Sequence, residues 1–138
     1  MIETELVQEV MGDFSESLLK LSDAVNGGLP KSFLRTTLRH VFPEPADQIR
    51  FLYRVVPEAT FKRRQGRLSP AESERTERLA RVIATAEYCL EDKELARQFL
   101  TSPHWNYNGK MPLETALTEL GARQVEELLF GMAFGLPA

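Results

Sequence analysis

The chain has 138 residues, 43% of them apolar and 27% charged, which is typical of one small globular domain or two lobes with a shared core and excludes a disordered chain. The formal net charge is −3, but the charges are distributed unevenly along the chain. Residues 31–67 carry nine bases and three acids, whereas residues 1–30 carry one base and six acids. Cys89 is the only cysteine, so no internal disulfide forms, and without a membrane-spanning run or a secretion signal we expect a cytoplasmic protein with no membrane partner.

The first predicted element is a long amphipathic helix that ends at Asn26-Gly27-Gly28. Its apolar residues step by three or four positions along one face: Ile2, Leu6, Val10, Phe14, Leu18, Leu21 and Val25. Such a stripe exposes more apolar surface than a small domain covers alone, so we expect a homodimer.

Three shorter helices are predicted before residue 67. Pro30 suits the first turn of a helix that closes before Pro43. The next runs from about Pro45 to Arg54, and a turn separates it from a helix over residues 58–65. The apolar positions expected to face inward are Phe33, Leu34, Leu38, Ile49, Leu52 and Tyr53.

The strongest helix start in the chain follows at Ser69. Ser69 is the predicted N-cap, Pro70 takes the first helical position, and Glu72 lies where it can accept from the Ser69 amide. A long buried stripe follows, formed by Leu79, Val82, Ile83, Ala86 and Leu90.

The remaining segments are predicted helices joined by an aromatic loop. A helix over residues 92–100 buries Leu95, Ala96, Phe99 and Leu100; a short helix opened by Pro112 buries Leu113, Ala116, Leu117 and Leu120; and a last helix spans 122–134. Gly121 is predicted to end the short helix. No segment alternates like a strand, so the predicted fold is all-α, with an N-terminal region 1–67 and a C-terminal domain 68–138.

The stretch from Asp47 to Arg64 has the outline of a helix-turn-helix. Its second helix would carry a basic end toward a DNA groove, where arginine forks suit guanine edges and phosphates. The candidate DNA contacts are Arg54, Thr60, Lys62, Arg63, Arg64 and Arg67. A merely solvated basic surface gives the same pattern, so both interpretations remain open here.

No catalytic, metal or cofactor constellation is visible, so we expect neither an enzyme nor a cofactor. His40 and His104 are far apart and have no cysteine at ligand spacing, and Cys89 reads as a small core residue. Arg75 and Arg78 belong to a charged helix surface or bind a partner carboxylate, and Trp105 caps a core edge or anchors an interface.

The chain ends in "LLFGMAFGLPA", with no charge after Glu127. Its apolar side chains include Met132, Phe134 and Leu136. Such a tail either folds back on its own core or inserts into a partner.

Two stretches together identify a family. "TFKRRQGRLSPAESERTERLARV" and "ELARQFLTSPHWNYNGKMPLETALTELGARQVEELLFGMAFG" resemble the Xre/MbcA/ParS class of antitoxins, which pair with RES-domain toxins. The matching positions are Thr60, Arg63, Arg64, Leu68, Ser69, Glu72, Ser73, Arg75, Gly109, Pro112, Leu113, Thr118, Gly121, Val125 and Gly135, and the match covers roughly the last 80 residues. Residues 30–65 resemble an Xre-type helix-turn-helix more loosely.

The resemblance implies an antitoxin that binds its toxin through the C-terminal part, whose tail blocks the NAD-consuming site. It also implies that the N-terminal part dimerises and binds the operon's promoter. The toxin-binding residues implied are Arg75, Arg78, Trp105, Gly131, Met132, Phe134, Gly135 and Leu136. Family members commonly carry arginine where this sequence has Gly131, so here the tail would either act by steric plugging alone or have a different register. The alternative is a stand-alone helix-turn-helix regulator with a protein-binding C-terminal domain.

Overall fold

The computed structural model describes residues 18–135, and all regular elements in that range are helical. The elements are α2 (Leu18–Asn26), α3 (Lys31–Arg39), α4 (Pro45–Val55), α5 (Glu58–Arg63), α6 (Pro70–Leu90), α7 (Lys93–Thr101), the 3-10 turn η2 (Trp105–Tyr107), α8 (Pro112–Thr115) and α9 (Glu119–Phe134). The predicted all-α class is confirmed. The predicted first helix is described only from Leu18 onward, so Ile2, Leu6, Val10 and Phe14 lie outside the described residues.

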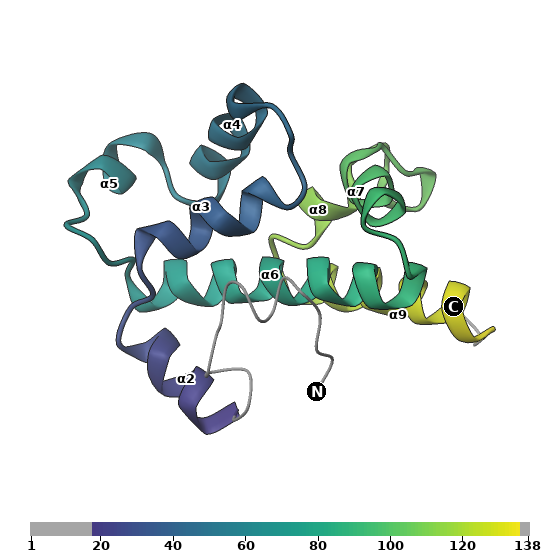
Figure 1. Cartoon of the computed structure of the whole chain (residues 1–138), viewed down its shortest axis with the longest axis horizontal. Coiled ribbons are helices and arrows are strands. Elements are labelled where there is room, and N and C mark those ends of the chain that lie inside the picture. The colour runs from purple at the N-terminus through teal and green to yellow at the C-terminus, as the bar shows by residue number, and fades with distance from the viewer. Residues whose placement is uncertain (1–17, 136–138) are drawn as a thin grey trace.

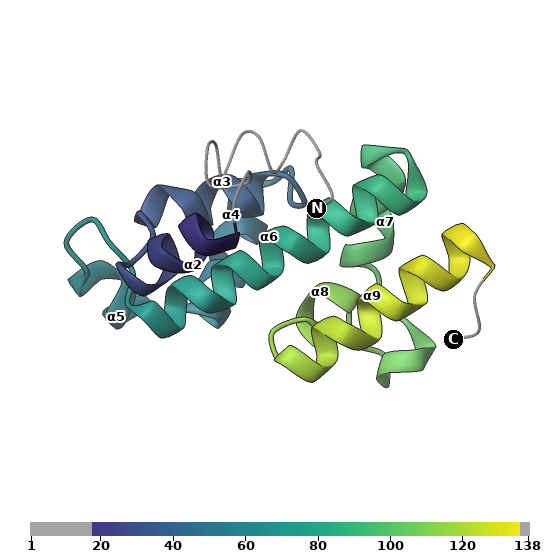
Figure 2. The same ribbon diagram turned by 90° about the horizontal axis from the view of Figure 1, so that it is seen from below.

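The longest helix, α6, is the axis of the molecule (Figure 1). Helices α2, α3 and α4 contact α6, and so do α7 and α9. Figure 2 shows α9 running beside the second half of α6, while α2 to α5 gather around its first half. One continuous helix therefore supports both groups of shorter helices.

The start of α6 has the predicted cap. The Ser69 hydroxyl accepts from the Glu72 amide at 3.2 Å, and the Glu72 carboxylate accepts from the Ser69 amide at 2.9 Å. Two amides that the helix leaves without partners are thereby satisfied. The helix ends at Glu91, which adopts a left-handed conformation with φ of 55°.

The core lies along both sides of α6. Its fully buried large side chains are Leu29, Leu34, Leu38, Val41, Val55, Val56, Leu79, Ile83, Leu100, Leu113 and Leu129. Three residues expected inside are instead exposed: Ile49 by 52%, Leu95 by 50% and Leu120 by 71%. The buried positions beside them are Leu52, Ala96 and Ala122. Each helix buries only one stripe of its surface, and the three exposed residues lie outside that stripe.

The corner between α8 and α9 differs from the prediction. Gly121 does not end the short helix; it lies in the first turn of α9, where its amide donates to the Thr118 hydroxyl at 3.0 Å. A Cβ atom at Gly121 would lie 1.8 Å from the carbonyl oxygen of Thr115. Gly121 is therefore needed because two backbone segments approach closely.

None of the described helices is long and apolar enough to span a membrane.

Candidate functional sites

The helices α4 and α5 form the predicted helix, turn, helix. Val56 and Pro57 make the turn, and the aromatic ring of Phe61 anchors α5 because it is buried and meets Tyr53 edge-on at 6.5 Å. The opposite side of α5 exposes Lys62 and Arg63, with Thr60 half-buried beside them. The arrangement presents a short basic helix to solvent.

Most of the predicted DNA-contacting cations already have partners within the chain. Lys62 pairs with Glu58 at 2.8 Å, and the guanidinium of Arg64 binds both oxygens of Glu72, at 3.0 and 2.8 Å. A hydrogen bond to Glu58 raises the pKa of Lys62, and the hydrogen bond from Arg64 is the main cause that lowers the pKa of Glu72.

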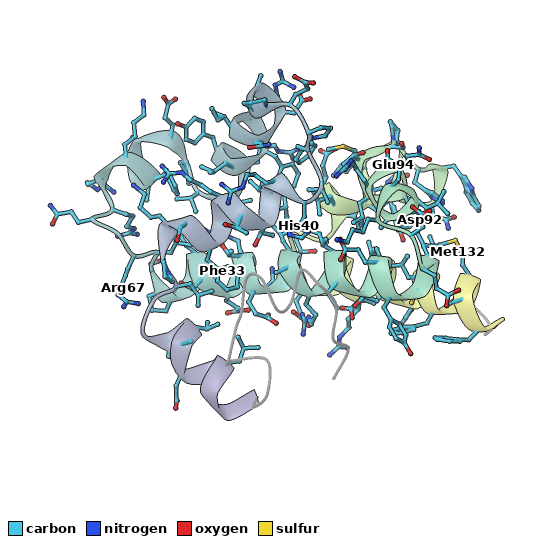
Figure 3. All side chains as sticks on the ribbon, in the orientation of Figure 1. Phe33, His40, Arg67, Asp92, Glu94 and Met132 are labelled. Carbon is cyan, nitrogen blue, oxygen red and sulfur yellow. The ribbon has the colours of Figure 1, made fainter. Side chains whose placement is uncertain are left out.

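Two other cations in this set lie outside α5. Arg54 lies on α4 and pairs with Glu114 of α8, and Arg67 donates to the carbonyl of Gly28 at 2.7 Å. Figure 3 shows Arg67 at the end of the molecule nearest α5. Among the described residues, no ion pair involves Arg63, so its charge faces solvent without a counter-ion.

Helix α3 carries further basic residues, which were not among the predicted DNA contacts. The ammonium of Lys31 lies 4.2 Å from the centre of the Phe61 ring, and the guanidinium of Arg35 lies 5.1 Å from it. Bases spaced by four, at positions 31, 35 and 39, are visible in the sequence and mark one helix face. Only the fold shows that this face adjoins α5.

The two arginines predicted to bind a partner carboxylate make internal contacts. The Arg75 guanidinium donates to the Val55 carbonyl at 3.2 Å, at the end of α4. Arg78 is 7% exposed and donates to the Leu117 carbonyl at 2.8 Å, to Glu74 at 2.9 Å and to Glu119 at 3.2 Å. Both side chains therefore fasten α6 to neighbouring elements.

The loop between α7 and α8 exposes Trp105. Its indole is 83% exposed and stacks on the His104 ring at 5.9 Å, whereas Tyr107 is buried. Asn108 and Gly109 close the turn with φ of 56° and 80°. The loop is folded tightly, and it holds a large apolar side chain in solvent.

The end of α9 leaves apolar side chains uncovered. Met132 is 50% exposed and Phe134 is 55% exposed, and the Phe134 ring stacks on Phe130 at 5.9 Å. Gly131 is half-buried within the helix, and Gly135 ends it with φ of 66°. Figure 3 shows Met132 at the end of the molecule opposite α5. Leu136 lies outside the described residues.

Nothing in residues 18–135 suggests metal binding or thiol chemistry. No group of three or more potential metal ligands occurs there. Cys89 is half-buried, and burial raises the pKa of its thiol, which disfavours the reactive thiolate.

Comparison with known proteins adds a family relationship. Residues 20–81 match the antitoxin Xre-like helix-turn-helix domain, and residues 85–135 match the antitoxin Xre/MbcA/ParS C-terminal toxin-binding domain. The chain is also similar to the antitoxin Xre of Pseudomonas putida strain KT2440, with 33% identity over 84 residues, which is 59% of this chain and 53% of that relative. It thus spans about half the length of that relative.

Proposed function

Since this chain belongs to the Xre family of antitoxins, we propose that it neutralises a RES-domain toxin and represses its own operon by binding promoter DNA. The observation that carries the proposal is that a helix-turn-helix domain and a toxin-binding domain follow one another on this chain. The basic helix α5 lies in the first and the exposed end of α9 in the second. We propose a functional division into residues 1–67 and 68–138, ahead of α6, whereas the two family matches meet within α6, between residues 81 and 85.

For the toxin, we assign the contact to the exposed apolar side chains of the second domain. Met132 and Phe134 lie half in solvent at the end of α9, which supports insertion into a partner over folding back. Fully burying such side chains contributes about 1.5–3 kcal/mol each before ordering costs are subtracted. With Gly131 in place of the family's arginine, the end of α9 blocks the toxin's NAD-binding site by its bulk.

For DNA, we assign the contact to α5 with Thr60 and Arg63. A homodimer would place two copies of α5 on the two halves of a palindromic operator, as helix-turn-helix proteins do. Lys62 and Arg64 would contact phosphates while they keep their carboxylate partners, so their contribution is smaller than that of Arg63.

Co-expression with a RES-domain toxin encoded next to this gene tests the toxin assignment. Wild-type protein should restore growth and co-purify with the toxin. The variant Met132→Ser/Phe134→Ser should lose both while it keeps its melting temperature, because both side chains are exposed.

The matched control is Ile49→Ser, since Ile49 is an equally exposed apolar residue on α4. Its rescue should equal that of the wild type. Full rescue by the tail variant would refute the role of α9, and absence of rescue by the wild type, with promoter binding intact, would favour the stand-alone regulator.

A further inference from the structure

Helix α3 carries a stripe of positive charge that belongs to neither of the contact surfaces proposed above, α5 and the end of α9. Its nine residues include three bases and no acid, and Lys31, Arg35 and Arg39 are spaced by four, so they share one face. The opposite face buries Phe33, Leu34, Thr37 and Leu38. Packing therefore fixes which way the stripe faces.

The stripe is joined to α5 through an aromatic ring. Lys31 and Arg35 both lie over the ring of Phe61, and the Lys31 ammonium donates to the Arg64 carbonyl at 3.2 Å. The contacts with Phe61 limit the conformations of two long side chains that are otherwise free to move. Lys31 and Arg35 therefore lie beside the Phe61 side of α5 and next to its carboxyl end at Arg64, whereas Lys62 and Arg63 lie on the opposite side of that helix.

The charges of the stripe are not neutralised by the chain. Within residues 18–135, no ion pair involves Lys31, Arg35 or Arg39; Arg39 donates only to the Thr36 hydroxyl, at 2.8 Å. Some other exposed cations are paired, as Arg50 is with Asp47 at 2.8 Å and Lys62 is with Glu58 at 2.8 Å. Three adjacent cations without counter-ions repel one another, and a polyanion relieves that repulsion.

We propose that Lys31, Arg35 and Arg39 bind the phosphates of the DNA strand beside the groove that α5 enters. This inference rests on the proposed DNA binding and extends it to a second helix. Eight residues of helix span about 12 Å, the axial rise of about three to four phosphates on one strand. Contacts of this kind add affinity and fix the position of the protein without reading sequence.

The test is the salt dependence of binding to two duplexes of equal length, one from the DNA directly upstream of the gene and one with that sequence scrambled. The test variant is Arg35→Gln/Arg39→Gln, and both residues are exposed. Its matched control is Lys110→Gln/Arg123→Gln, which removes two exposed charges from the second domain. Circular dichroism should show the same melting temperature for both variants.

For the test variant, the slope of log affinity against log salt should become shallower by about 1.8 per bound protomer, from about 0.9 per phosphate. If the curves converge near 1 M salt, binding at 0.1 M salt should be about 60-fold weaker for each bound protomer, or about 4,000-fold weaker for a homodimer that contacts DNA through both copies, on both duplexes alike. The control and the charge-preserving Arg35→Lys/Arg39→Lys should keep most of the wild-type slope.

Equal slopes for the test variant and the control would overturn the inference while leaving DNA binding through α5 intact. A loss confined to the upstream duplex would also overturn it, because it would make these arginines base readers. Wild-type protein that binds neither duplex would refute the proposed DNA binding itself.

Discussion

The close approach of backbone segments at Gly121 predicts that Gly121→Ala destabilises the fold, which is the opposite of its usual effect within a helix. In an unconstrained helix, Gly→Ala stabilises by about 1 kcal/mol. Here the new Cβ would lie 1.8 Å from the Thr115 carbonyl oxygen, 2.8 Å from its carbon and 2.9 Å from the Thr118 hydroxyl. Two of these atoms belong to the backbone, so no side-chain rotation relieves the contact, and the corner between α8 and α9 must move.

Overpacking of this kind costs about 1–3 kcal/mol, and a backbone clash belongs at the upper end. With the propensity gain subtracted, Gly121→Ala should destabilise the fold by about 2 kcal/mol, which lowers the melting temperature by about 8 °C in a chain of this size. Thermal unfolding followed by circular dichroism measures this.

The calibrating variant is Gln124→Gly, at an exposed position three residues later in α9. It should cost about 1 kcal/mol by propensity alone. If Gly121→Ala melts at or above the wild-type temperature, the reasoning from the close contact is wrong.

Three further predictions concern single side chains. Glu77→Gln should raise the melting temperature at pH 7, because burial raises the pKa of Glu77 and its charged form is disfavoured; the gain should vanish below the ordinary carboxyl pKa of 4.5, where Glu77 itself is neutral. Glu72→Gln should lower the melting temperature at pH 7, because the Arg64 hydrogen bond holds the pKa of Glu72 below 4.5; that stabilisation is present above 4.5 and disappears as the pH falls through the lowered pKa, so the two melting curves should converge in acid. Trp105→Ala should leave the free energy of unfolding within about 0.5 kcal/mol of wild type, since the indole is 83% exposed, and should reduce toxin co-purification; undiminished co-purification would exclude Trp105 from the interface.

The helices could be predicted where local chemistry determines them. The helix cap formed by Ser69, Pro70 and Glu72 could be predicted from the sequence because these residues are within three positions of one another. Gly121 was misassigned for the opposite reason: the atom that requires a glycine there is the Thr115 carbonyl, and its approach depends on how two helices meet.

The sequence shows which residues of the candidate sites are basic or apolar, but not which of them are already bound by other parts of the chain. The sequence shows that Arg54, Arg64 and Arg78 are basic, but the acids that hold them, such as Glu114 for Arg54, are up to 60 residues away. The α3 stripe was overlooked because its importance comes from Phe61, which lies 22 or more residues later and brings α3 and α5 together.

The shared helix α6 also determines how the two halves of the described chain are oriented relative to each other. Both family matches have a boundary inside it, at residues 81 and 85, so the two halves meet without a linker. Inserting one residue between them would turn everything after it by about 100° and advance it by 1.5 Å. A change in the length of α6 would therefore alter how the helices before the insertion are oriented relative to those after it.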